Sequence, residues 1–236
     1  MSIASRFSRP SWMPKYVPRA GDGCVLWLPG QDDPKSATIR DRSGNRNNGA
    51  ISGATWGRNS KGLWVLDFDG TDDWVNCGTS TSLNPTTAFT ILAWIKRDAI
   101  GNMNICSQGT LGVGWMWEFY SNDRLRFYGQ FGGGGYGSKN GSTAYNDITA
   151  YHLYGVVYDN TNLTFYYDGV AKTPIATTGA LSNDTGDTFK LGAREYAGAN
   201  DVFLNGQMGL FIMASSAFTA AQITNIRNQD RHLFGV

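Results

Sequence analysis

Short runs of aromatic and β-branched residues, separated by Gly, Asn and Asp turns, recur along this 236-residue chain. Such runs favour β-strands, and the residues between them favour tight reversals of the backbone. In the clearest case, the run 163–167 is followed by Asp168-Gly169, which accepts the positive φ angles of a type I′ turn. The pattern predicts an all-β sandwich or jelly roll, with strands at 24–28, 63–68, 90–96, 115–120, 124–128, 151–158, 163–167 and 208–214.

One helix is expected near the end of the chain, at 219–228. Thr219 can cap its first turn, and Gln222 completes a capping-box pattern three residues later. Ile223 and Ile226 supply an apolar stripe at helical spacing. With 30 glycines and 13% aromatic residues, the rest of the composition favours strands and turns.

Glutamate is scarce, and this limits carboxylate catalysis. The only two glutamates are Glu118 and Glu195, and all other acidic residues are Asp. No close glutamate pair, of the kind that retaining glycosidases often use, is therefore present.

The cysteines and histidines do not form a recognisable covalent or metal framework. Cys24, Cys77 and Cys106 show no CxxC spacing and are odd in number, so we expect buried free thiols. His152 and His232 are too few and too far apart in sequence to suggest a zinc site.

No segment approaches the roughly 20 consecutive apolar residues of a membrane-spanning helix, so no membrane partner is expected. The N-terminus also lacks the apolar run of about 7 to 15 residues found in a signal peptide. We therefore expect synthesis in the cytoplasm without this route of export. The glycine run 132–135 lacks a following Gly-Lys-Ser/Thr, which argues against nucleotide binding.

Residues 1–22 differ from the rest and are interpreted as an N-terminal arm, ahead of a domain at 23–236. Residues 1–20 hold four basic residues and no acid, so a net charge of +1 for the chain leaves −3 on the remainder (1 − 4). Pro10, Pro14 and Pro18 favour an extended path. The residues expected to contact a partner are Arg6, Phe7, Arg9, Trp12, Lys15, Tyr16 and Arg19.

Three surfaces could receive this arm. It could pack on its own domain, or it could dock on a neighbouring subunit or another protein. Nucleic acid is the third alternative, since basic residues interleaved with aromatic ones can bind phosphates and stack on bases. Four charges make it the weakest of the three.

Several segments, in order, resemble the laminin G-like (LamG) branch of the concanavalin A-like lectin/glucanase superfamily. The resemblance covers about residues 23–230 and is carried by Asp-Arg-Ser-Gly-Asn at 41–45 and Phe-Asp-Gly-Thr-Asp-Asp-Trp-Val at 68–75. The strand-like segments 25–28, 89–95, 151–159 and 163–170 and the helical segment 218–227 complete it. It implies a concanavalin A-like jelly roll of two antiparallel sheets, with one short C-terminal helix and an extended arm.

The resemblance also bears on catalysis. The catalytic branch of this superfamily usually carries a Glu-x-Asp-x-x-Glu strand, whereas Glu118 has no second acid on its strand. We therefore expect a protein that is not an enzyme and requires no cofactor.

Calcium is a separate question, because many relatives bind it. Asp69, Asp72 and Asp73 could supply oxygen ligands. The alternative, which we prefer, is that they cap a turn. The Asp and Glu that relatives often carry in the last strand are replaced here by Gly209 and Leu210.

The segment 208–213 is apolar at every position that is not glycine, so both of its faces need cover. The closing helix or the arm could cover the outer face, or the face could be a subunit interface.

Two functional hypotheses follow. The first is a noncatalytic, virion-associated structural or binding protein, a capsid decoration or tail-associated attachment protein, anchored through its arm. Its partners would be other virion or structural subunits, or further copies of itself, and its location would be the virion. It accounts for a fold typical of extracellular proteins on a chain without an export signal.

The second hypothesis is a carbohydrate-binding module, because exposed aromatic rings stack on sugars. The residues expected to contact a glycan are Trp115, Trp117, Tyr120, Tyr128, Gln130, Tyr136 and Asn140. On an alternating strand Trp115, Trp117 and Phe119 share one face, and the alternative is that this face is core. A glycoside hydrolase is the least favoured function.

Overall fold

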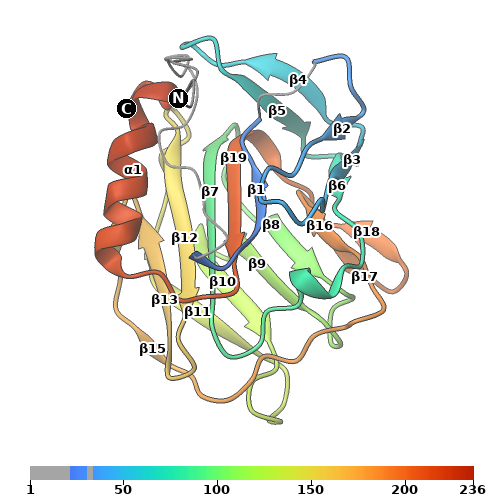
Figure 1. Ribbon diagram of the computed structural model, residues 1–236, viewed down its shortest axis with the longest axis vertical. Helices are drawn as coiled ribbons and strands as arrows, with labels where there is room; N and C mark the ends of the chain where they lie inside the picture. The colour runs from blue at the N-terminus through green and yellow to red at the C-terminus, as the bar shows by residue number, and fades with distance from the viewer. Residues whose placement is uncertain (1–21, 31–33) are drawn as a thin grey trace, which may run out of the picture.

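The structure of the protein is a computed structural model that describes residues 22–30 and 34–236. Two antiparallel sheets pack face to face and one helix lies alongside them (Figure 1). The predicted all-β jelly-roll sandwich with a single C-terminal helix is therefore confirmed. The seven arm residues expected to contact a partner, from Arg6 to Arg19, lie outside the described residues.

The first sheet, sheet A, is built around the long central strands β7 (Phe89–Arg97) and β19 (Asn205–Ala214), which lie side by side. In both, aromatic and aliphatic residues dominate, as expected of strands covered on two faces. The sheet continues through β12 (His152–Tyr158), β13 (Asn162–Tyr167) and β14 (Val170–Ala171) on one side and β5 (Trp64–Asp69) and β4 (Thr55–Arg58) on the other. Two further strands, β1 (Cys24–Leu28) and β15 (Ile175–Ala176), pair with β19 and β13.

The second sheet, sheet B, runs in the order β11 (Gly137–Ala144), β10 (Arg124–Gly129), β9 (Trp115–Tyr120), β8 (Met103–Gln108), β16 (Phe189–Leu191), β6 (Trp74–Asn76), β3 (Gly49–Ser52) and β2 (Thr38–Ile39). A short 3-10 helix, η2 (Thr81–Leu83), follows β6. A separate hairpin, β17 (Arg194–Tyr196) and β18 (Ala199–Asp201), follows β16.

The predicted turn between β13 and β14 is confirmed. Asp168 and Gly169 both have positive φ angles, of 50° and 79°. Tyr167 pairs directly with Val170 across the turn, so the loop has two residues.

The main core lies between the two sheets and is rich in aromatic residues. Phe127 lies on Phe89 of the opposite sheet, with ring centroids 5.4 Å apart. The three cysteines Cys24, Cys77 and Cys106 are buried and free, as predicted from their number and spacing.

A second core lies between the outer face of sheet A and helix α1 (Ala220–Phe234). Ile223 and Ile226 are fully buried against this face, where Leu210 and Ile212 of β19 also lie. The predicted capping box is present. The Gln222 N–H donates to the Thr219 side chain, and the Thr219 N–H donates to the Gln222 side chain. The helix therefore covers the outer face of the apolar segment 208–213, which the sequence predicted to need cover.

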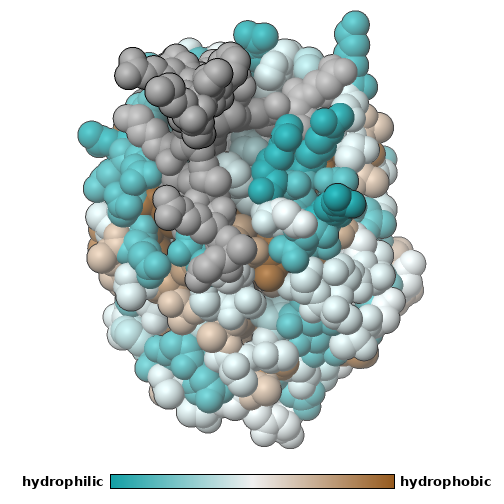
Figure 2. Space-filling view, viewed as in Figure 1, coloured by the Kyte–Doolittle hydropathy of each residue, from teal (hydrophilic) through white to brown (hydrophobic). Residues whose placement is uncertain are grey.

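The surface is mixed in character. Figure 2 shows hydrophobic residues scattered over the viewed face rather than gathered into one patch. No helix in the described part of the chain is long and apolar enough to cross a membrane.

Candidate functional site

Strand β9 divides its side chains between the core and the outer face of sheet B. Trp115, Trp117 and Phe119 point into the core and are 0% exposed. Met116, Glu118 and Tyr120 occupy the alternate positions and lie on the opposite face. Met116 and Glu118 are also 0% exposed, so Tyr120 is the residue of β9 through which this face can meet a ligand, beside β10 and β11.

This placement corrects two of the residues expected to contact a glycan. The ring of Trp115 stacks on Phe127, and its indole N–H donates to Gln108 and Asn183 at 3.0 Å each. Trp117 is equally enclosed. Neither ring can stack on a sugar, and the alternative stated from the sequence, that this face is core, holds for both.

Three of the remaining residues form a row of half-buried tyrosines, Tyr120, Tyr128 and Tyr136, here called the tyrosine row. The guanidinium carbon of Arg126 lies 3.4 Å from the Tyr120 ring centre and 5.9 Å from that of Tyr128. The rings of Tyr128 and Tyr136 are 6.0 Å apart, with planes inclined by 20°. The row therefore holds one flat cation between two of its three rings, which suits an extended polar ligand with apolar faces.

Asn140 and Gln130 take different places. Asn140 is exposed on β11 directly opposite Arg126, so it borders the tyrosine row. Gln130 instead donates its amide N–H to the carbonyl of Gly134 and holds the glycine-rich loop. The Tyr136 hydroxyl fixes the other end of this loop by donating to the Val113 carbonyl.

A buried ionic network lies beneath the row. Glu118 is 0% exposed and its carboxylate contacts Arg126, while the guanidinium of Arg194 lies 3.7 Å away. Arg194 also makes a bidentate pair with Asp201, at 2.9 and 3.1 Å. Burial raises the pKa of Glu118, and the two arginines oppose this shift. The network holds Arg126 in place between the tyrosines.

The β17–β18 hairpin rests against the same sheet. The Ser107 hydroxyl donates to the Ala193 carbonyl at 2.9 Å, and the Leu111 N–H donates to the Glu195 carbonyl at 3.0 Å. Lys190 joins the hairpin by contacting Glu195 and Asn200. Exposed apolar side chains on this hairpin and on the β8–β9 loop, Tyr196 and Val113, give the face an apolar border.

The sequence did not single out Arg126 and Arg194. A signal for Arg126 was present, since the alternation Arg124-Leu-Arg126-Phe-Tyr128 places it on the same face as Tyr128. Arg194 had no comparable signal, because its contact with Glu118 joins distant parts of the chain.

The aspartates considered for calcium lie at the turn between β5 and β6. The carboxylates of Asp69, Asp72 and Asp73 come within 4.8 Å of one another. One oxygen of Asp73 accepts the Asp69 N–H and one of Asp69 accepts the Thr71 N–H, both at 2.8 Å. Burial, followed by the neighbouring aspartates, raises the pKa of Asp73. Because calcium takes six to eight oxygens, these contacts favour turn capping.

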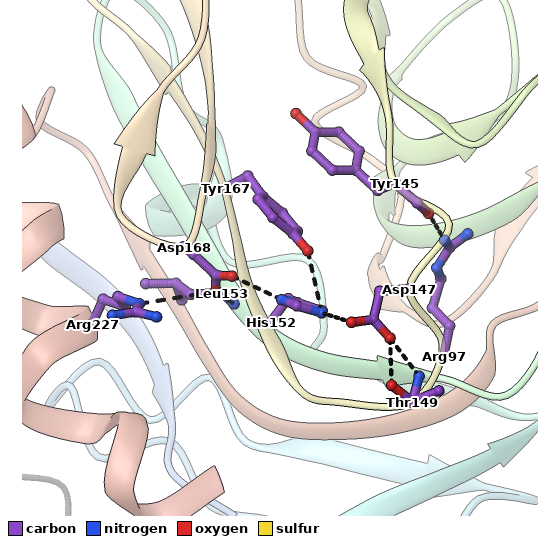
Figure 3. Close-up of polar contacts among 9 residues, drawn as sticks. All are labelled: Arg97, Tyr145, Asp147, Thr149, His152, Leu153, Tyr167, Asp168 and Arg227. Carbon is purple, nitrogen blue, oxygen red and sulfur yellow. Dashed lines mark hydrogen bonds and ion pairs between the residues drawn. The ribbon is translucent and has the colours of Figure 1, made fainter. Parts of the chain in front are cut away.

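A second polar cluster surrounds His152 at the start of β12 (Figure 3). Its Nδ1 lies 2.8 Å from Asp168, and its Nε2 lies 3.2 Å from both Asp147 and the Tyr167 hydroxyl. Asp168 also lies 4.0 Å from Arg227 of α1. Burial lowers the pKa of His152, but the two aspartates outweigh it, so the net shift is upward. The cluster ties the loop before β12, the β13–β14 turn and α1 together.

Comparison with known proteins adds the family. A sequence profile described as the concanavalin A-like lectin/glucanases superfamily (Laminin_G_3) matches residues 69–224. No curated protein sequence matches the chain.

Solved structures share the fold at low identity. The binding domain of paraclostridial mosquitocidal protein 1 is 14% identical, with a TM-score of 0.68 over 88% of this chain and 52% of that one. Domain 4 of AbnA, an extracellular arabinanase from Geobacillus stearothermophilus solved with arabinotriose, is 12% identical, with a TM-score of 0.66 over 86% of this chain and 98% of that one.

Botulinum neurotoxin type C, described as entering cells through two ganglioside molecules, is 16% identical, with a TM-score of 0.62 over 88% of this chain and 51% of that one. The chain thus spans about half the length of the two toxin chains. The profile match over most of the chain and the two-sheet sandwich establish that this protein belongs to the laminin G-like family of the concanavalin A-like lectin/glucanase superfamily.

Proposed function

We propose that this chain is a noncatalytic glycan-binding module whose site is the tyrosine row on the outer face of sheet B. The observation that carries the proposal is the alignment of Tyr120, Arg126, Tyr128 and Tyr136 on one face. Sugar rings present apolar faces that pack on aromatic rings, and their hydroxyl groups bond to flanking polar side chains. Asn140, which is exposed on β11 opposite Arg126, is placed to supply such a bond.

The ionic network supports binding rather than catalysis. Glu118 is enclosed and charge-balanced by Arg126 and Arg194, so its carboxylate is engaged in holding the row. A general acid needs access to the glycosidic oxygen, and a fully buried carboxylate lacks it.

The comparisons support a binding role by analogy of fold. The domain from the arabinanase was solved with arabinotriose, the mosquitocidal protein structure is a binding domain, and botulinum neurotoxin type C is described as entering cells through two ganglioside molecules. Fold alone does not fix the ligand, so the argument for this chain rests on its own tyrosines.

The test is binding of neutral oligosaccharides, arabinotriose among them, on a glycan array followed by titration of the strongest ligand. Tyr128→Ala should weaken binding about tenfold, the effect of losing about 1.4 kcal/mol of stacking. Trp56→Ala is the matched control, because Trp56 is a half-buried aromatic residue on β4 of sheet A. Absence of binding to every array glycan would reject the proposal.

Attachment to a virion through the arm is the second candidate function, and it rests on the sequence of residues 1–22. The basic and aromatic residues of this segment suit docking on another protein. Deleting residues 1–22 should abolish association with particles and leave glycan binding unchanged. A monodisperse monomer that still associates with particles after this deletion would contradict the assignment.

A further inference from the structure

A pocket of about 310 Å³ opens on the sheet A side of the sandwich, beside the end of α1 marked C in Figure 1. Its walls come from the β4–β5 turn, the end of β7, the loop before β12, the start of β19 and the last residues of the described chain. The tyrosine row lies on sheet B, so the two sites share no residue. The volume falls at the lower end of the roughly 300 to 1,000 Å³ typical of ligand pockets.

The pocket wall is fixed by Asn59, which is 8% exposed. Its amide N–H donates to the Leu233 carbonyl at 2.8 Å, and its amide oxygen accepts the N–H groups of Lys61 and Leu63, both at 3.0 Å. These bonds join the β4–β5 turn to the end of α1. The pocket is therefore preformed, which reduces the entropy lost on binding.

The floor combines rings with fixed polar groups. The rings of Tyr151 and Phe234 are 5.2 Å apart. The Tyr151 hydroxyl donates to the Gln207 amide oxygen at 2.5 Å, and Gln207 donates one N–H to Asp67 at 3.2 Å. Burial, and then the negative charges of Asp67 and Asp98, raise the pKa of Tyr151, so the phenol stays neutral. The Gln207 amide keeps a second N–H for a ligand.

Two cations stand at the pocket. The guanidinium carbon of Arg58 lies 4.4 Å from the centre of the Trp64 ring, and Arg58 makes no ion pair with any residue in the described ranges. Lys96 pairs with the exposed Asp98 at 3.0 Å. No acidic side chain is among the described residues that line the pocket. The lining side chains therefore include two cations and no carboxylate, which favours a ligand that carries an anionic acceptor.

We propose that this pocket binds a small acidic saccharide through its carboxylate, with Arg58 and Lys96 contacting the carboxylate and Gln207 donating to the sugar. The Arg58 fork matches a carboxylate in two N–H bonds, and Trp64 supports the guanidinium from behind. The hydroxyl groups of a single sugar ring can use Ser60 and Thr149 at the wall. The pocket is a second binding site, independent of the neutral glycan site proposed on sheet B.

In the test, the full chain is titrated separately with glucuronate, glucose and acetate, and NMR measures the binding of each. Glucuronate and glucose differ at one carbon, so comparing them measures the contribution of the carboxylate. Acetate carries a carboxylate without a sugar ring, so comparing it with glucuronate measures the contribution of the ring. We expect glucuronate to bind at least about tenfold more tightly than either of the others. Arg58→Gln should weaken glucuronate binding about tenfold, whereas Arg46→Gln, which removes an exposed cation that does not line the pocket, should leave it unchanged.

Three results would overturn the assignment. Glucose or acetate binding as tightly as glucuronate would reject recognition of an acidic sugar. An unchanged affinity in Arg58→Gln, with an unfolding midpoint equal to that of the wild type, would reject this pocket. Loss of glucuronate binding in Tyr128→Ala would move the site to sheet B, whereas failure of neutral glycans alone would reject only the proposed function.

Discussion

The ring of Phe234, at the end of α1, lies almost flat on the indole of Trp94 in β7, with centroids 4.5 Å apart and planes inclined by 14°. Gly209 of β19 allows this approach, because a β-carbon at that position would collide with the Phe234 ring. The contact anchors α1 to the centre of sheet A. Gly209 is therefore a packing requirement of this chain.

Gly209→Ala should lower the free energy of unfolding by about 1 to 3 kcal/mol, because the added methyl group overpacks a filled site. Urea denaturation measures the change. Gly135→Ala is the control, since a β-carbon there meets nothing within 4 Å and the backbone is not in the left-handed region. Equal stability of the two variants would contradict the packing argument.

Glu118→Gln should lower the free energy of unfolding by about 3 kcal/mol, because it leaves Arg126 buried without its counter-charge. Denaturant unfolding checks this. The same variant tests the noncatalytic assignment: if the wild type cleaves a β-glucan and the variant does not, the assignment is wrong.

The pair of histidines gives a pH prediction. The folded-state pKa of His152 is raised, so its contribution to stability is complete below the unfolded value of about 6.5 and is lost as the pH rises through the higher folded value. The unfolding midpoint should therefore decrease as the pH is raised from about 6 to about 8. His152→Gln should flatten this slope, and the exposed His232→Gln should retain it. A slope unchanged in His152→Gln would show that other groups cause it.

The same cluster should also lose stability at low pH, through Asp147. Hydrogen bonds from Thr149, and then from His152, lower the pKa of Asp147 to about 2. Its contribution is present above the unfolded pKa of about 3.9 and is lost as the pH falls toward about 2. Thr149→Val should bring acid unfolding to a higher pH, as followed by circular dichroism. Coincident acid transitions of variant and wild type would refute the role of this hydrogen bond.

Calcium should not change the unfolding midpoint, because Asp69 and Asp73 already cap the β5–β6 turn. Thermal unfolding in calcium and in a chelator provides the comparison. Asp73→Asn should lower the midpoint in both conditions, since it disturbs a buried acceptor. If calcium instead raises the unfolding midpoint of the wild type but not that of Asp72→Ala, the result would support a metal site.

The sequence predicted the strands themselves better than it predicted which face of each strand points into the core. Alternation along β9 separates two sets of side chains, but it does not say which set is core. From the sequence, Trp115 and Trp117 could equally have formed a platform. In the structure Trp115 stacks on Phe127, which packs against Phe89 of the opposite sheet, and Tyr158 packs on Phe89. The choice depends on contacts between residues far apart in the chain.

Other features escaped prediction for local reasons. Strand β11 reads Gly-Ser-Lys-Asn-Gly-Ser-Thr-Ala, a composition that favours loops, and it forms a strand because β10 supplies its hydrogen bonds. The pocket beside α1 gathers Arg58, Lys96 and Gln207 from three strands. No spacing along the chain could have indicated it.

Sheet A is packed on both faces, and this should make its central strands the part of the molecule that unfolds locally least often. Strands β7 and β19 lie between the inter-sheet core and α1, so their amide hydrogens should exchange most slowly with solvent. The tyrosine row lies on the other sheet, outside this slowly exchanging unit. Its residues can therefore be varied for new ligands while the most protected part of the molecule is left intact.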